Sequence, residues 1–520
     1  MLRGVLTVGS WTMGSRILGF ARDMLIAAML GAGPIADAFF VALKLPNLFR
    51  RLFGEGAFNA AFVPAFAALL AAEGRPAAHR FAEETFAVMA FWLGALTIAG
   101  ELLMPQMMQV LAPGFAATPD KFALAVTLSR ITFPYLLLIC LAALVSGVLN
   151  GLDRFTAASA SYVLFNVVSI ACMLWLTPYV ATAGHALSWG VTASGVAQLG
   201  LLLWALRRAG MGLRLPRPRL TPQIRVLLRR MLPGLVGAGV TQLNLAVDVI
   251  IASLLPAGTV SLLYYADRVQ QLPLGVIGTA VGTALLPLLS RQVRAGEAEA
   301  SLDTLNRAIE YALFLTLPAA VALVVTAYPV MWTLFGRGAF DAESARLSAQ
   351  ALSAYALGLP AFGLVKVLAP GFFARGDTAT PVKIGVAAVA LNLAMNVAFM
   401  VPLQHVGPAL ATSLAAIFNV GWLGAVLARQ GHLRPDARLW GRSLRMVAAA
   451  TAMGVALWLA QSVLFAAPLH GMERFAALAA LVVLGMAAYA AGVMALGAAE
   501  WRDFGRMVLR RRTGRRAGPG

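Results

Sequence analysis

Apolar segments recur along the whole chain, and short polar stretches separate them. About fourteen of these segments reach the roughly 20 residues that a helix needs to cross a bilayer. The predicted spans lie near residues 5–31, 36–72, 82–111, 121–150, 155–179, 184–206, 231–256, 259–290, 306–335, 345–374, 382–402, 406–429, 443–467 and 474–497. The pattern therefore predicts an all-α membrane protein that crosses the bilayer many times.

The composition excludes a soluble globular protein. Of the 520 residues 60% are hydrophobic and only 12% are charged, and the mean hydropathy is +0.79. The formal net charge is +19. In a soluble protein that charge would suggest nucleic-acid binding, but no soluble domain carries a basic stripe here. We therefore expect membrane lipids, and not nucleic acid, to be the partners of the basic segments.

The loops between the predicted spans alternate in charge. One set is rich in arginine, above all the connector Arg207–Arg230, while loops such as Gly31–Ala36 and Thr177–His185 are nearly free of it. Gly336–Arg346 is a mixed exception. Because Lys/Arg-rich loops stay in the cytoplasm, the alternation predicts an even number of spans with both termini cytoplasmic.

The two halves of the chain resemble each other. Asp23–Gly33 matches Asp248–Gly258 without a gap, although chance similarity between Ala/Leu-rich helices is the alternative. Duplicated halves are typical of transporters. The repeat predicts a first six-helix lobe at 1–215, a second at 216–432 that begins with the basic connector, and a final helix pair with a basic tail at 433–520.

Charged residues lie inside the apolar segments. A charge at the bilayer centre costs roughly 2.5–3.5 kcal/mol on insertion scales, so such residues usually face a wet cavity or a partner. The arginines in question are Arg16, Arg22, Arg50, Arg51 and Arg268. The guanidinium fork suits phosphate, which predicts a site for a pyrophosphate-sized anion. The alternative is structural pairing with Asp23, Glu55 or Asp267.

Neutral oxygen ligands form a second group. The pairs Asn244 with Asp248 and Asn392 with Asn396 are each four residues apart, and Thr412 precedes Ser413. Such side chains could hold a monovalent cation between helices, but interhelical hydrogen bonding is an equally common use. The chain contains no GxxxxGK[ST], HExxH or GxSxG motif, so we expect a protein that is not an enzyme.

Several segments closely resemble the MurJ (MviN) lipid II flippases. They are SRILGFARD at 15–23, DAFFVALKLPNLFRR at 37–51, EGAFNAAFVP at 55–64, YADR at 265–268 and PLGVIGTAVGTALLP at 273–287. The resemblance covers essentially the full chain. It implies the multidrug/oligosaccharidyl-lipid/polysaccharide exporter superfamily, the bacterial inner membrane, and transport of lipid II from the cytoplasmic to the periplasmic leaflet by alternating access.

The resemblance also implies particular site residues. The positions that match the family's substrate cavity are Arg16, Arg22, Asp23, Asp37, Asn47, Arg50, Arg51, Glu55 and Arg268. The last two helices would form a groove for the polyprenyl tail. The positions that match the sodium site of some members are Asp248, Asn392, Asn396 and Thr412. Where those members have a carboxylate this chain has Asn396, which removes a negative ligand and counts against sodium. Sodium or the membrane potential is the expected driving force.

Three other functions are the alternatives. A cation-coupled drug exporter of the same superfamily would need an acidic cavity, contrary to the arginines, and a polysaccharide-lipid flippase would carry a related substrate. A scaffold that only recruits cell-wall synthesis proteins would leave the intramembrane arginines and the repeat without a role. The expected substrate is therefore lipid II, with no resident cofactor and with cell-wall synthesis proteins as further contacts.

Overall fold

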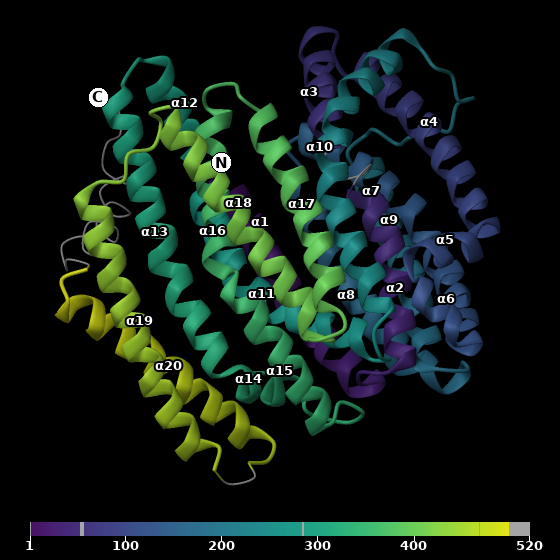
Figure 1. Ribbon diagram of the computed structural model, residues 1–520. Helices are drawn as coiled ribbons and strands as arrows, with labels where there is room; N and C mark the ends of the chain where they lie inside the picture. The colour runs from purple at the N-terminus through teal and green to yellow at the C-terminus, as the bar shows by residue number, and fades with distance from the viewer. Residues whose placement is uncertain (1, 52–56, 283–284, 467–468, 499–520) are drawn as a thin grey trace. The chain divides into compact units, whose positions relative to one another are not determined.

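The computed structural model describes residues 2–51, 57–282, 285–466 and 469–498, and most of these residues form helices (Figure 1). The helices up to the middle of the chain are α1 (Leu2–Leu30), α2 (Pro34–Phe49), α3 (Ala57–Ala72), α4 (Arg75–Leu102), α5 (Met104–Leu111), α6 (Pro119–Thr132), α7 (Tyr135–Gly151), α8 (Phe155–Leu176), α9 (Ala183–Arg208) and α10 (Pro222–Ser253). The short 3₁₀ helices η2 (Pro113–Ala117) and η3 (Thr177–Tyr179) interrupt this series.

The remaining helices are α11 (Thr259–Gly282), α12 (Leu285–Arg294), α13 (Ala298–Val325), α14 (Ala327–Phe335), α15 (Ala342–Leu357), α16 (Leu359–Phe373), α17 (Ala379–Phe399), α18 (Val406–Arg429), α19 (Ala437–Leu464) and α20 (Met472–Ala495). Each predicted span corresponds to one of these helices or to two consecutive ones. The predicted class, an all-α protein with about fourteen spans, is confirmed.

Proline explains several of the paired helices. Pro134 separates α6 from α7, and α5 and α16 carry a proline in their first turn. Proline lacks the N–H that continues a helix and clashes with the preceding turn. Within the described residues, ten helical segments are long and apolar enough to cross a membrane.

The first compact unit comprises Met1–Leu262 and Arg337–Asp341. In it α8 packs against α1 and α9, α7 against α9, and α2 against α6. Small residues make these approaches close: a Cβ on Gly195 would lie 2.7 Å from the Tyr135 ring, and one on Gly190 3.1 Å from Cys172 Cβ. Close backbone packing of this kind replaces the hydrophobic drive that apolar helices lack in a membrane.

The seventh span, α10, also belongs to the first unit, where it packs against α3. The boundary between the two compact units is set by which helices pack together, whereas the predicted lobes are defined by the internal sequence repeat. The lobe limits 1–215, 216–432 and 433–520 therefore stay predictions.

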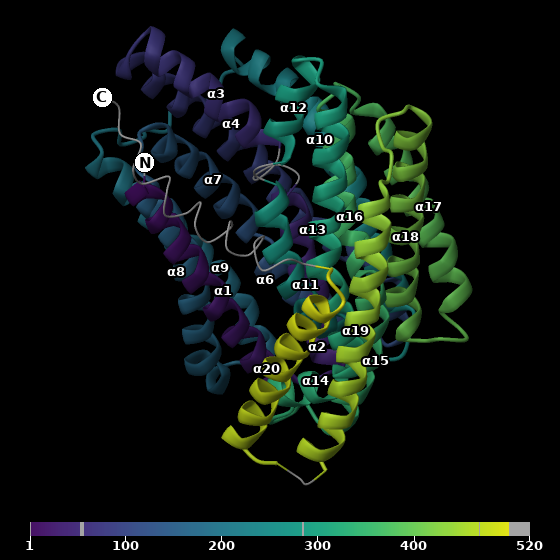
Figure 2. The same cartoon turned by 90° about the vertical axis from the view of Figure 1, so that its left-hand side faces the viewer.

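The second compact unit comprises Leu263–Gly336 and Ala342–Gly520. Within it α13 packs against α15, α16 and α19, and α19 pairs with α20 (Figures 1 and 2). Met453, Leu457 and Leu481 lie in the apolar core between the last two helices and α13. The Tyr489 hydroxyl donates to the Phe314 carbonyl at 3.1 Å, which ties α20 to α13 directly.

An ion network joins α19 to α13 at one end. Glu310 is buried and accepts hydrogen bonds from Arg307 and Arg442. Arg307 also bonds Asp436, whose other oxygen accepts the Leu439 N–H at 2.7 Å and caps α19. A buried carboxylate is tolerated because two arginines satisfy it. The network therefore holds the start of α19 against α13.

The loop-charge prediction of topology can be tested by cysteine labelling. Single cysteines at Gly33, Ala117 and Val406 should react in intact cells with a membrane-impermeant thiol reagent, because these positions lie in the arginine-poor loops. A cysteine at Arg217, in the basic connector, should react only after permeabilisation. Labelling of Arg217→Cys in intact cells would contradict an even number of spans.

Replacing Glu310 should loosen the final helix pair. Glu310→Ala leaves Arg307 and Arg442 without their buried carboxylate, and breaking a buried pair typically costs about 3–5 kcal/mol. Thermal unfolding of the purified protein should show a clearly lowered midpoint. Glu343→Ala is the matched control, since the exposed Glu343–Arg346 pair should contribute at most about 1 kcal/mol. Equal midpoints for both variants would exclude a stabilising role for the network.

Candidate functional site

The first predicted site residues meet on α1. Arg22 is buried, and its Nη2 and Nε donate to Asp23 Oδ1 at 2.9 and 3.3 Å. Its guanidinium lies 5.3 Å from the centre of the Phe165 ring on α8. Pairing and ring contact together lower the cost of the buried charge. Arg16 lies exposed on the same helix, and Arg22 forms an ion pair with Asp23.

A second arginine is positioned at the end of α2. Arg50 Nε donates to Asn47 Oδ1 at 3.2 Å, and Asn47 Nδ2 donates to the Leu43 carbonyl at 2.8 Å. The asparagine thus couples the guanidinium to the helix backbone. Arg51 is exposed. Glu55, the predicted partner of Arg51, lies outside the described residues.

Asp37 accepts four hydrogen bonds within the first unit. Its Oδ2 accepts from Lys121 Nζ at 2.8 Å and from the Gly258 N–H at 2.7 Å. Its Oδ1 accepts from the N–H and the hydroxyl of Ser261 at 2.9 and 2.8 Å. The carboxylate therefore caps the first turn of α11, where a negative charge is favoured. A substrate role for Asp37 stays a prediction, since both oxygens are engaged within the first unit.

Lys121 is a residue that the sequence analysis missed. Its side chain is 8% exposed, and Nζ lies 4.0 Å from the centre of the Phe115 ring. The only signal in the sequence was a lysine at the start of a predicted span, where it reads as an ordinary interfacial residue. Its pairing with Asp37 bridges 84 positions of the chain, which no local pattern reveals.

Arg268 lies on α11 in the second unit. Its Nη2 donates to the Tyr264 hydroxyl at 2.7 Å, and its guanidinium stands 4.8 Å from the centre of that ring. Asp267 instead accepts from Gln271 Nε2 at 2.6 Å. The aromatic side chain one turn earlier therefore orients Arg268.

The predicted sodium ligands are divided between the two units. Asp248 belongs to the first, whereas Asn392, Asn396 and Thr412 belong to the second. Asn396 Nδ2 donates to Asn392 Oδ1 at 3.1 Å, and both side chains are buried. This hydrogen bond lies within α17, and the sodium site stays a prediction. Among the described residues no three His, Cys, Asp or Glu side chains gather as metal ligands.

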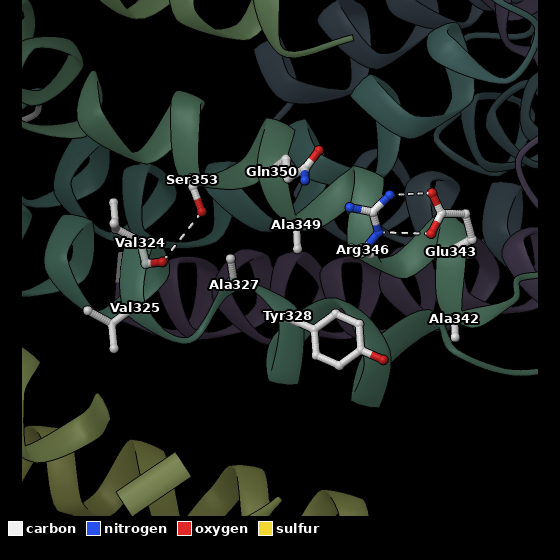
Figure 3. Close-up of a pocket in the computed structure, with 10 residues that line it drawn as sticks. All are labelled: Val324, Val325, Ala327, Tyr328, Ala342, Glu343, Arg346, Ala349, Gln350 and Ser353. Carbon is white, nitrogen blue, oxygen red and sulfur yellow. Dashed lines mark hydrogen bonds and ion pairs between the residues drawn. The ribbon is translucent and has the colours of Figure 1, made fainter. Parts of the chain in front are cut away.

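Each unit contains a cavity. The cavity in the second unit has a volume of about 700 Å³ and lies between α13, α14 and α15 (Figure 3). Glu343 and Arg346 form a paired bridge at one end of it, and Ser353 donates to the Val324 carbonyl at the other. No predicted site residue lines this cavity. The cavity in the first unit, of about 340 Å³, is lined by Arg50.

His405 borders the region of the larger cavity. It hydrogen-bonds through Nε2 with Gln350 Oε1 at 2.9 Å. Burial lowers the pKa of His405, and the charge of Arg346 lowers it further. The imidazole is therefore neutral at pH 7.

Comparison with known proteins identifies relatives over nearly the whole length. The family model described as "Lipid II flippase MurJ" matches residues 26–488. A "Probable lipid II flippase MurJ" of Rhizobium meliloti (strain 1021) is 45% identical over 97% of this chain and 95% of its own. The "Lipid II flippase MurJ" of Burkholderia cenocepacia is 35% identical over 94% of this chain and 96% of its own.

Solved structures show the same fold. One described as "Lipid II flippase MurJ, inward closed conformation" matches with a TM-score of 0.79 and 24% identity, over 96% of this chain and 99% of that chain. An inward-facing multidrug resistance MATE family transporter of the MOP superfamily matches with a TM-score of 0.67 and 13% identity, over 80% of this chain and 95% of that chain. Both likenesses concern the fold.

Asp37→Asn tests the capping role of the carboxylate. The substitution keeps the shape but replaces one charged acceptor by an amide, which leaves Lys121 buried without its counter-charge. We expect the free energy of unfolding to fall by about 3–5 kcal/mol, measured by thermal unfolding in detergent. The double variant Asp37→Asn with Lys121→Met removes both charges and should recover part of the loss. A double variant as unstable as the single one would exclude the ion pair as the cause.

Proposed function

The chain belongs to the lipid II flippase MurJ family, and on that premise we propose that it moves lipid II from the cytoplasmic to the periplasmic leaflet of the bacterial inner membrane. Lipid II is a polyprenyl pyrophosphate that bears a disaccharide–pentapeptide. The transport cycle is alternating access, with both termini in the cytoplasm. Contacts with cell-wall synthesis proteins belong to the same proposal.

The incomplete pairing of Arg22 is the observation that carries the proposal. A guanidinium has five N–H donors, and Arg22 uses two of them on Asp23. Nη1 makes no hydrogen bond within the described part of the chain. An arginine held in an apolar helix with donors to spare is suited to bind an anion that enters the membrane protein. The pyrophosphate of lipid II is such an anion.

Arg50 supports the same chemistry from another helix. Asn47 orients its guanidinium, and the residue lines the cavity of the first unit. A second cation on α2 matches the two charged groups of a pyrophosphate better than one arginine does. Drug export of cations would instead require carboxylates that lack basic partners, whereas Asp23 and Asp37 are both paired with basic side chains.

Translocation by the purified protein is the direct test. In vesicles that contain the protein, fluorescent lipid II on the cytoplasmic side should become inaccessible to an added probe faster than in vesicles without protein. Repeating the measurement with a sodium gradient and with a membrane potential would identify the driving force. Failure of the protein to accelerate lipid II movement under all of these conditions would contradict the proposal.

Substitution of the arginines should impair transport in a graded manner. Arg22→Ala and Arg50→Ala remove charge and hydrogen bonds, while the lysine variants keep the charge but lose the bidentate fork. Losing one charged hydrogen bond costs about 1.5–3 kcal/mol, or roughly tenfold to a hundredfold in affinity. The measurement is complementation of a flippase-depleted cell, with expression checked by blot.

The control for these variants is Arg217→Ala, in the exposed connector, which should support normal growth. The same assay on Arg268→Ala tests the predicted role of the second half. Well-expressed Arg22→Ala and Arg50→Ala proteins that both sustain growth would show that these arginines are structural.

Asp248→Asn tests ion coupling. The variant keeps the size and hydrogen bonding of the side chain but removes the charge that would attract a cation. If sodium drives transport through Asp248, the variant should lose the sodium dependence of lipid II translocation in vesicles. A wild-type rate with unchanged sodium dependence would remove Asp248 from the coupling mechanism.

A further inference from the structure

The cavity in the first unit is lined by polar groups that the protein itself does not satisfy. It lies among α3, α7, α8 and neighbouring helices and has a volume of about 340 Å³. Ligand pockets are usually about 300–1,000 Å³, so this space accepts one small chemical group. Asn59 of α3 and Ser146 and Asn150 of α7 line it.

These three side chains have hydrogen-bonding capacity to offer. Asn59 Oδ1 is buried without a hydrogen-bond partner. The side chains of Ser146 and Asn150, one helical turn apart, make no hydrogen bond within the described residues. The serines of α8 that line the same cavity differ, since Ser159 and Ser161 donate to carbonyls of their own helix at 3.0 and 2.7 Å. A buried unsatisfied polar atom is costly, which favours a polar occupant of the cavity.

Gly147 keeps the space next to Asn59 open. A Cβ at this position would lie 3.5 Å from Asn59 Oδ1 and 3.4 Å from the Phe62 ring. Any larger side chain on this face of α7 would therefore contact Asn59 Oδ1. The glycine therefore places no side chain of α7 against the asparagine oxygen.

The charge of the lining restricts the occupant. Arg50 is the one charged residue among the described side chains around this cavity, and the polar groups otherwise are amides and hydroxyls. The positive charge of Arg50 disfavours a cation, and a polyprenyl chain would leave the amides unsatisfied. Phe155 and Tyr162 add aromatic surface. Neutral hydrogen-bonding groups beside aromatic rings and one arginine suit a hydroxylated, uncharged group that is attached to an anion.

We propose that this cavity is a subsite for a sugar residue of the lipid-linked substrate, with Arg50 meeting the adjoining phosphate. The inference rests on the proposed function and adds to it a place for the glycan. Asn59, Ser146 and Asn150 hydrogen-bond sugar hydroxyl or acetamido groups. The volume admits a single sugar, so the second sugar and the peptide lie outside the cavity.

Binding of two lipids to the purified full-length protein tests the subsite. The probes are polyprenyl pyrophosphate and the same lipid carrying the disaccharide, each titrated into protein in nanodiscs. The Ser146→Ala/Asn150→Ala variant loses two neutral hydrogen-bonding groups and should bind the sugar-bearing lipid about tenfold more weakly. Its affinity for the sugar-free lipid should equal that of the wild type. Arg50→Ala should weaken both lipids.

Thr127→Ala is the control for the substitutions, because this exposed hydroxyl bonds only the Ala123 carbonyl of its own helix. It should bind both lipids as the wild type does. If the double variant fails to fold, the single variant Ser146→Ala is the test. Its affinity for the sugar-bearing lipid should fall about threefold, and its affinity for the sugar-free lipid should not change. Undiminished binding of the sugar-bearing lipid, or equal loss of both lipids by a folded variant, overturns the subsite. A wild-type protein that binds neither lipid overturns the proposed function itself.

Discussion

A charged side chain inside an apolar helix needs a partner within hydrogen-bonding distance, because burial removes the water that would otherwise stabilise it. The first unit satisfies this constraint at Asp37, where Lys121 and the first turn of α11 supply four hydrogen bonds. The second unit satisfies it at Glu310, between Arg307 and Arg442. In both places the ion pair joins helices that are distant in sequence, so the same bonds that neutralise the charge also hold the bundle together.

Between these ionic contacts the helices are held by close packing. Gly190 and Gly195 allow α9 to pack closely against its neighbours. Gly454 does the same for α19, because a Cβ at this position would lie only 2.6 Å from Val321 Cγ1. Apolar residues gain little from facing one another instead of lipid, so shape and small size decide which helices meet. This explains why helices of ordinary hydropathy form specific pairs at these glycines.

The sequence predicts the helices well because hydropathy is a local property, and each span requires about 20 apolar residues. It also indicates Arg22 and Asp23 as a pair, since adjacent residues share one turn. It does not predict the Lys121–Asp37 contact, because the two residues are separated by 84 positions and each has an ordinary local explanation. Tertiary geometry, which one sequence does not contain, decides among such alternatives.

The number of unused hydrogen-bonding groups separates structural charges from binding ones. Asp37 accepts four hydrogen bonds and is 1% exposed, so any ligand would first have to displace those partners. Arg22 spends two of five donors on its neighbour, and Asn59 keeps a buried oxygen without a partner. An unpaired buried polar group costs free energy, so the proposed binding residues would destabilise the fold slightly until a ligand satisfies them. The same motif segments therefore contain both kinds of residue, and only their hydrogen-bond partners distinguish them.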